Sequence, residues 1–158
     1  MRIGFGYDSH RFASGRRLVL GGVEFPGEDG LAGHSDADAL IHALIDALFG
    51  AAALGDIGSH FPDGDPKWKD ADSTELLAAA VAEVAAAGYR IVNVDATVVC
   101  ERPRLAGRIG AIRERLAGLL GVPVSAVSVK GKTNERMDDV GAGAGVAVYA
   151  VALVDEIT

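Results

Sequence analysis

The spacing of hydrophobic and polar residues changes along the chain, and each spacing predicts a different kind of element. Residues 3–10 and 18–23 are short strand-like runs separated by a polar turn, and residues 26–33 form a glycine-rich loop. Between residues 40 and 49, apolar side chains return every three or four positions, which is the period of an amphipathic helix. We expect this helix to end near Gly55.

The start of this helix carries a capping signal. Ser35-Asp36-Ala37-Asp38 is typical of a capping box, in which a hydroxyl and a later acid satisfy free backbone N–H groups. At about 100° per residue, Asp38, His42 and Asp46 form a stripe along the edge of the apolar half of the helix. This stripe places an imidazole where the core meets a cleft.

The rest of the chain shows the same two periods. The segment from residue 55 to residue 66 is too rich in Gly, Pro and Asp to be regular, and we expect a long loop that serves as a lid or binding segment. Helices are predicted over residues 73–88 and 105–120, and strands over residues 89–99, 127–131 and 145–154. The last strand is apolar at nearly every position, which implies cover on both faces from helices or from another subunit.

This order of elements predicts the fold class. Strands and helices in this sequence suit an α+β fold, a two-layer sandwich in which helices cover one face of a single mixed sheet. The chain has 158 residues and no visible repeat, so we expect one domain over residues 1–158. Hydrophobic residues make up 49% of the chain and charged residues 23%, which indicates a packed protein rather than a disordered one.

Net charge and cysteine content narrow the possible functions. The net charge of -7 argues against a general binder of nucleic acid or anionic membranes. The single cysteine, Cys100, excludes an internal disulfide and is compatible with a reducing compartment. The N-terminus lacks a secretory signal, and the longest uncharged apolar run, residues 146–154, is too short to span a bilayer. We therefore expect a soluble, cytoplasmic protein with no nucleic-acid or membrane partner.

One carboxylate and two imidazoles form a candidate zinc site. If residues 8–10 are extended, Asp8 and His10 point to the same face, and His42 then comes from the first helix. Three protein ligands would leave a fourth position open for chemistry. Asp46, one turn after His42, is placed to accept the spare ring N–H of a metal-bound histidine. The alternative is that Asp8 and His10 are surface strand residues and His42 a histidine at the edge of the core.

Several segments are candidates for binding phosphate. Lys132-Thr133-Asn134-Glu135 combines an ammonium, a hydroxyl and a carboxylate, which suits phosphate together with magnesium, or else it is a polar turn. His34-Ser35 precedes a helix N-terminus, which attracts anions, or it only caps that helix. Arg102 and Arg104 offer two guanidinium groups for phosphate or a base, or they form an exposed basic turn.

Other polar and glycine-rich segments are less informative. Asp56, Asp63 and Asp65 would repel phosphate, so as ligands they suit hydroxyls or metals, and otherwise they are solvated turn formers. Residues 131–133 resemble the end of a P-loop, but Ala126 stands where the first glycine of that motif would be. Residues 141–145 imitate a dinucleotide fingerprint but precede a strand, so we reject both assignments.

Seven segments of the chain form a recognisable set: Gly4-Phe5-Gly6-Tyr7-Asp8-Ser9-His10, Leu20-Gly21-Gly22-Val23, His34-Ser35-Asp36-Ala37-Asp38, residues 39–46, Ala51-Ala52-Ala53-Leu54-Gly55-Asp56-Ile57-Gly58, Phe61-Pro62-Asp63 and Asp72-Ser73. This set closely resembles the 2-C-methyl-D-erythritol 2,4-cyclodiphosphate synthase family. The resemblance implies a phosphorus-oxygen lyase of the non-mevalonate isoprenoid pathway. Such an enzyme converts 4-diphosphocytidyl-2-C-methyl-D-erythritol 2-phosphate to the cyclic diphosphate and releases CMP.

The same resemblance implies roles for individual residues. Asp8, His10, His34, Thr133 and Glu135, whose main roles follow, would also contact the substrate. By motif, Asp8, His10 and His42 would hold Zn²⁺, and Glu135 would help to hold Mg²⁺ or Mn²⁺ on the substrate diphosphate. His34 and Thr133 match residues that stabilise the transition state. The residues that match contacts to the methylerythritol and phosphate portions are Ser35, Asp56, Ile57, Gly58, Phe61, Asp63 and Asp65. Those that match contacts to cytidine are Pro103, Arg104 and Lys132. The resemblance also implies a homotrimer with active sites between subunits.

One region departs from the family pattern. Many bacterial members carry an aromatic residue followed by Gly-Arg-Gly-Glu-Gly before the last strand, and these residues line an axial channel that can hold isoprenoid diphosphates. Residues 138–145 here lack that arginine and contain additional acid. We therefore assign no ligand role to Asp139 or Ala142 and expect weak binding of isoprenoid diphosphates, as calorimetry with farnesyl diphosphate would show.

Two other functions remain open from the residues alone. A zinc hydrolase, in which the metal activates water, fits the three candidate ligands and predicts linear hydrolysis products. A trimeric module with a structural zinc ion also fits, and it predicts closed coordination by four protein ligands.

Overall fold

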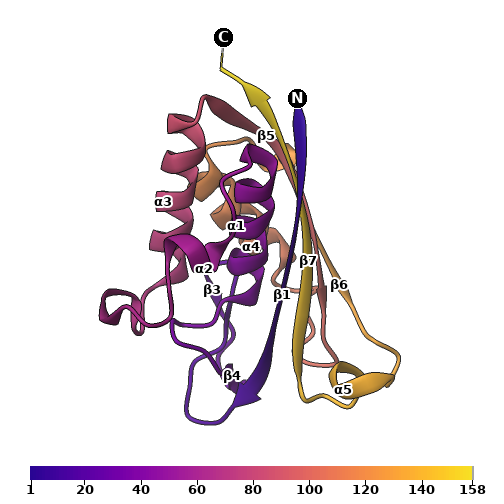
Figure 1. Cartoon of the computed structure of the whole chain (residues 1–158). Coiled ribbons are helices and arrows are strands. Elements are labelled where there is room, and N and C mark those ends of the chain that lie inside the picture. Colours follow the sequence, from indigo (N-terminus) through magenta and orange to yellow (C-terminus); the bar gives the residue numbers. More distant parts are fainter. Residues whose placement is uncertain (158) are drawn as a thin grey trace.

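The computed structural model describes residues 1–157, which build a mixed sheet of five strands in the order β4-β1-β7-β5-β6 (Figure 1). β5 and β6 run parallel, and the other neighbouring pairs are antiparallel. The strands are β1 (Arg2–Ala13), β4 (Gly30–Leu31), β5 (Tyr89–Val99), β6 (Val127–Lys132) and β7 (Gly145–Glu156). β7 lies between β1 and β5, so both long edges of the last strand are hydrogen-bonded.

Three long helices cover one face of this sheet (Figure 1), which confirms the predicted two-layer α+β fold. They are α1 (Ala39–Ala52), α3 (Ser73–Ala86) and α4 (Ile109–Leu120). Shorter helical turns are α2 (Ile57–His60), α5 (Asp138–Gly141), η1 (Pro66–Trp68) and η2 (Val124–Ala126). Within the described part of the chain, no helix combines the length and the apolar character needed to cross a membrane.

Several elements differ from the sequence prediction. The strand predicted over residues 18–23 is a small hairpin of β2 (Val19–Leu20) and β3 (Val23–Glu24). Its turn is Gly21-Gly22, and both glycines have positive φ (63° and 71°), the conformation that tight hairpin turns require. The prediction of an irregular segment over residues 55–66 is wrong in part, because α2 forms within it. The sequence prediction also missed β4 and α5.

The capping box predicted at the start of α1 is also corrected. The N-cap is Asp38, which is fully buried and accepts hydrogen bonds from the N–H groups of Ile41 (3.1 Å), Gly21 (2.9 Å) and Gly22 (2.7 Å). Ser35 instead accepts from the N–H of Ala37 within the preceding turn. The acid therefore replaces the hydroxyl as the cap because it also satisfies the hairpin turn.

α1 packs directly on the backbone of β1. Because strand side chains alternate, Gly4, Gly6 and Asp8 share the face of β1 that meets α1, and both glycines are buried. A Cβ atom at Gly6 would lie 1.9 Å from the carbonyl oxygen of Ala43, and one at Gly4 would lie 1.9 Å from that of Ala47. The missing side chains therefore allow the helix to approach the strand at backbone contact distance.

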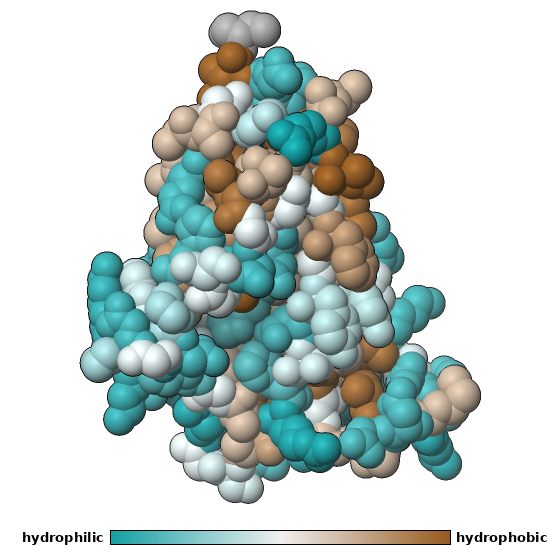
Figure 2. Space-filling model, viewed as in Figure 1, coloured by the Kyte–Doolittle hydropathy of each residue, from teal (hydrophilic) through white to brown (hydrophobic). Residues whose placement is uncertain are grey.

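The opposite face of the sheet exposes apolar and aromatic side chains. Ile3 is 71% exposed and Phe5 63%, and the rings of Tyr7 and Tyr149 pack with their centroids 5.2 Å apart. In Figure 2, hydrophobic residues in brown follow the right-hand edge of the upper half, on the side of the molecule where β1 lies. The helices thus bury one face of β7, and the second cover expected for that strand does not come from the described residues.

We expect Gly6→Ala to lower the free energy of unfolding by about 3 kcal/mol or more, because the added methyl would push α1 away from β1. Gly118→Ala is the matched control, since Gly118 is an exposed position in α4 with no atom of the described residues near its Cβ position. It should be neutral or stabilising by up to about 1 kcal/mol. Urea unfolding measures both variants, and equal stability of Gly6→Ala and the parent would contradict the close contact.

Candidate metal and substrate site

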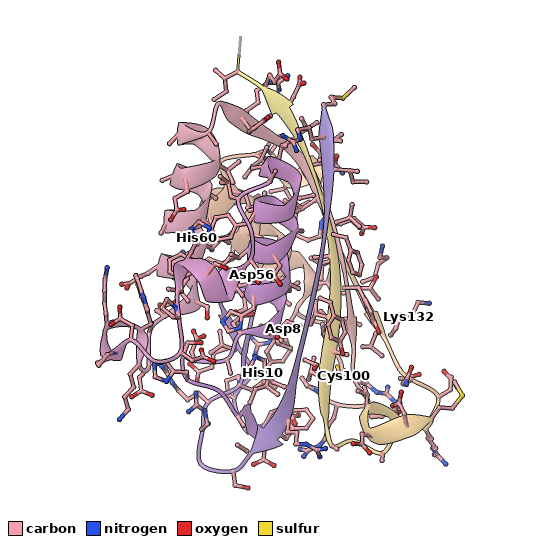
Figure 3. All side chains as sticks on the ribbon, in the orientation of Figure 1. Asp8, His10, Asp56, His60, Cys100 and Lys132 are labelled. Atoms are coloured by element: carbon pink, nitrogen blue, oxygen red, sulfur yellow. The ribbon has the colours of Figure 1, made fainter. Side chains whose placement is uncertain are left out.

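Asp8, His10 and His42 come together where β1 meets the first turn of α1 (Figure 3 labels Asp8 and His10). Asp8 Oδ2 lies 2.9 Å from His10 Nε2 and 3.1 Å from His42 Nδ1. One ligand atom from each residue lies within 4.8 Å of the others. Because Zn–N and Zn–O bonds are about 2 Å long, a cation between these atoms would reach all three ligands. The donor set therefore fits a divalent metal.

The local structure explains why these atoms converge. Asp8 and His10 are two residues apart on β1 and face α1, as the period of a strand requires. His42 precedes Ala43, the residue whose carbonyl contacts Gly6, so the close packing of α1 brings the imidazole to Asp8. His10 Nδ1 lies 2.6 Å from the carbonyl oxygen of Ala32, which can only accept, so this nitrogen carries the proton and Nε2 is left for a metal.

Within this group, Asp8 and His10 shift each other's pKa values. Burial favours the neutral form of Asp8, but hydrogen bonds and charge from His10 and His42 outweigh it and hold the pKa of Asp8 below 3.8. Burial opposes protonation of His10, yet Asp8 and the carbonyl of Ala32 raise the pKa of His10 above 6.5. The group therefore attracts positive charge, as protons or as a metal cation.

The expected partner of His42 is wrong. His42 Nε2 lies 2.9 Å from the hydroxyl of Ser73 and 3.2 Å from that of Ser35, while Asp46 accepts a hydrogen bond from the N–H of Ile57 (2.8 Å). Burial raises the pKa of Asp46, although this N–H lowers it. Asp46 thus holds the start of α2, and the spare nitrogen of His42 points toward the start of α3. From the sequence, Ser73 was a helix start and part of a family motif, with no predicted role at the metal site.

A cavity of about 220 Å³ opens beside the three ligands. Its walls include nine residues predicted to hold the metal or contact the substrate: Asp8, His10, His34, Ser35, His42, Ile57, Gly58, Phe61 and Asp63. His34 Nε2 is buried and has no hydrogen-bond partner among residues 1–157, so a polar group remains available in the wall. Trp68 and Leu76 also line this cavity, and neither was predicted from the sequence as a site residue.

Two predicted substrate contacts cap helical turns. Asp56 is the N-cap of α2 and accepts from the N–H (2.8 Å) and hydroxyl (2.6 Å) of Ser59, and these bonds lower the pKa of Asp56. Asp65 caps η1 and accepts from the N–H of Lys67 (2.9 Å). Neither residue lines the cavity beside the metal ligands. In the isolated chain both acids act as turn formers, which was the alternative stated from sequence.

The remaining predicted residues gather elsewhere. A second cavity, of about 360 Å³, lies where β5 and β6 end and is lined by Pro103, Arg104, Lys132 and Thr133. Figure 3 shows Lys132 on the β6 side of the sheet, away from Asp8 and His10. The Thr133 hydroxyl donates to Glu135 Oε1 (2.7 Å). One chain therefore separates the predicted site into a metal half and a strand-end half.

Two further residues, Cys100 and Asp139, have no assigned role in binding. Cys100 is buried, and burial followed by the charges of Glu101 and Glu28 raises the pKa of its thiol to about 11. A thiol of that pKa is a poor nucleophile at neutral pH. Asp139, in the region that departs from the family pattern, pairs with Arg11 at 3.1 Å. This pairing neutralises an arginine beside β7, and weak binding of isoprenoid diphosphates stays a prediction.

Comparison with known sequences identifies relatives along nearly the whole chain. The sequence profile of the YgbB family matches residues 1–155. A protein of Gloeobacter violaceus named 2-C-methyl-D-erythritol 2,4-cyclodiphosphate synthase is 58% identical over 156 residues, which cover 99% of this chain and 96% of the relative. A protein of the same name from Symbiobacterium thermophilum is 57% identical over 154 residues, 98% of each chain.

Solved structures agree with these matches. The bifunctional IspDF of Campylobacter jejuni superposes with a TM-score of 0.95 at 37% identity over 99% of this chain, which spans 42% of that longer protein. A CDP-bound 2C-methyl-D-erythritol-2,4-cyclodiphosphate synthase gives 0.90 at 39% identity, with 98% and 100% of the two chains covered. The CDP complex of IspF from Plasmodium falciparum gives 0.86 at 30% identity, with 99% and 97% covered. With these structural matches, and with relatives more than half identical from end to end, the chain belongs to the YgbB family.

Proposed function

We propose that this protein converts 4-diphosphocytidyl-2-C-methyl-D-erythritol 2-phosphate to 2-C-methyl-D-erythritol 2,4-cyclodiphosphate and CMP. The observation that carries the proposal is the group of Asp8, His10 and His42 at the wall of a cavity. The names of relatives more than half identical to the chain, and of CDP-bound structural neighbours, support the same reaction.

Two divalent cations belong to the proposal. Asp8, His10 and His42 would hold Zn²⁺, and Glu135 would help to hold Mg²⁺ or Mn²⁺ against the substrate diphosphate. Bound there, the cations would neutralise the crowded phosphates and the charge that develops on the leaving CMP. Glu135 lies in a turn with positive φ (51°), and its carboxylate accepts from Thr133, so its orientation is defined before any metal arrives.

The substrate supplies both reacting groups, so the protein's task is mainly positioning. An oxygen of the 2-phosphate forms a bond to the β-phosphorus, and the bond from this phosphorus to the CMP oxygen breaks with its electron pair going to CMP. His34, with an unpartnered Nε2 in the cavity wall, is placed to donate to a phosphate oxygen. Lys132 and Thr133 would hold the cytidyl diphosphate portion from the other cavity.

We further propose that the active site forms between subunits of a homotrimer. The metal half and the strand-end half line different cavities of one chain, which supports a site whose second half would come from a neighbouring copy. The exposed Ile3, Phe5 and Tyr149 on the uncovered sheet face offer the apolar contact that such an assembly needs. An uncovered apolar face on one side of a sheet is costly in water, which supports association.

Phosphorus NMR of the purified protein with the cytidyl substrate and magnesium tests the reaction. We expect CMP together with a cyclic product that retains both phosphates of the erythritol portion. His42→Ala should lower turnover at least about 100-fold, because a metal ligand is lost, while the far-UV spectrum stays unchanged. Linear phosphorylated products would indicate a zinc hydrolase instead, and an inactive protein with closed four-ligand metal coordination would indicate a structural module.

Zinc affinity should depend on pH with a defined sign. The pKa of His10 is raised, and the metal needs the unprotonated ring, so zinc must displace a proton below that pKa. Between about pH 8 and about pH 6 we expect affinity to fall, by up to about tenfold per pH unit for each proton displaced. Competition with a chromophoric chelator measures this, and an affinity independent of pH would contradict the ligand assignment of His10.

The trimer can be tested by sedimentation. We expect the parent to sediment at three times the chain mass, and Phe5→Glu to shift the population toward monomer, because a buried unpaired charge is costly at an interface. Phe5 is 63% exposed in the single chain, so the substitution should leave the fold of each subunit intact. A monomeric parent with full activity would refute both the trimer and the shared site.

A further inference from the structure

The two ring nitrogens of His42 face different surroundings. Nδ1 lies 3.1 Å from Asp8 Oδ2, on the side of the proposed metal. Nε2 lies 2.9 Å from the hydroxyl of Ser73, a residue 31 positions later that is fully buried. A neutral imidazole carries one proton, and the nitrogen that holds it cannot bind a metal. The direction of the Ser73 hydrogen bond therefore decides whether His42 can act as a ligand through Nδ1.

Asp36 sets that direction. The hydroxyl of Ser73 donates to Asp36 Oδ1, and an ionised carboxylate can only accept. Asp36 is fixed for this task, because Oδ2 accepts from the N–H of Ser73 (3.0 Å) and Oδ1 accepts from the N–H of Asp38 (3.1 Å). The one hydrogen of the Ser73 hydroxyl is thus committed to Asp36. Toward His42, the Ser73 oxygen can only accept, so Nε2 must donate.

We propose that Asp36 and Ser73 form a positioning relay that holds His42 in the tautomer protonated at Nε2 and so leaves the Nδ1 lone pair for the metal. The relay rests on the metal centre of the proposed function and adds two residues to it. Neither residue lines the cavity beside the ligands, so both act through His42. The relay also restrains the orientation of the ring, because the donor His42 lies in the first turn of α1 and the acceptor Ser73 is the first residue of α3.

Two groups compete with the relay. Ser35 Oγ lies 3.2 Å from Nε2 and already accepts from the N–H of Ala37, so its own hydrogen is free to donate to an unprotonated Nε2. Asp8 favours a proton on Nδ1 when no metal is present. The tautomer of His42 must therefore be measured in a variant that lacks the Asp8 carboxylate.

A purely structural role for Ser73 is the competing explanation. Ser73 is the first residue of α3, but the N-cap of that helix is Asp72, which accepts from the N–H of Thr74. The Ser73 hydroxyl is therefore not needed as the helix cap. Thr74 follows in the same turn and is also buried, at 9% exposure, which makes it a matched control. A structural role would affect the stability of both variants without changing the protonation of His42.

Nitrogen-15 NMR of the metal-free full chain with Asp8→Ala tests the tautomer, at a mildly alkaline pH where an imidazole is neutral. We expect His42 to be protonated at Nε2 and unprotonated at Nδ1. Adding Asp36→Ala releases the Ser73 hydroxyl to donate, so the fraction protonated at Nδ1 should rise. A His42 ring protonated mainly at Nδ1 in the Asp8→Ala chain, or a tautomer unchanged by Asp36→Ala, would overturn the relay.

The predicted effect of the relay on zinc binding is tested by chelator competition with single variants that keep Asp8. Ser73→Ala should weaken zinc binding by about 10- to 100-fold, as loss of a hydrogen-bond partner of a ligating histidine does, and Thr74→Ala by less than about threefold. An unchanged affinity in Ser73→Ala, or an equal loss in Thr74→Ala, would refute the relay. A parent that binds no zinc would refute the metal centre itself, whereas the NMR measurement judges the relay without metal.

Discussion

The contact between α1 and the backbone of β1 is the constraint on which the candidate site depends. Gly4 and Gly6 leave no room for a side chain, because a Cβ atom at either position would lie 1.9 Å from a carbonyl oxygen of the helix. This backbone-to-backbone packing therefore fixes how close α1 lies to the sheet. Asp8 continues the same face of the strand, and His42 lies next to the contacting residue Ala43, so backbone packing sets the geometry of the ligands.

Around this contact, carboxylates and carbonyls determine where protons and metals can sit. The carbonyl of Ala32 holds a proton on Nδ1 of His10, and the Ser73 hydroxyl accepts a hydrogen bond from the protonated Nε2 of His42, which leaves one nitrogen of each ring toward Asp8. The buried Asp38 joins the β2–β3 turn to the start of α1. Preorganisation of this kind lowers the reorganisation needed when a cation and a charged substrate bind.

The two faces of the sheet have different tasks. Helices bury one face, and the ligands lie on that face where β1 meets α1, whereas the other face carries exposed aromatic residues such as Phe5 and Tyr149. The strand-end cavity near Lys132 is separate from the metal cavity. The proposed site between copies would account for both facts, since association would cover the apolar face and join the two halves.

The sequence by itself determined the order of the long elements, the face shared by Asp8 and His10, and the family, because periods of two and about 3.6 residues and long motifs are local properties. Only the tertiary structure decided that Ser73 rather than Asp46 faces the ring of His42, and that Asp38 caps both a helix and a hairpin. Spacing along one helix identifies neighbours on its surface. It does not identify which way a ring turns, because that choice depends on donors and acceptors brought in by other segments of the chain.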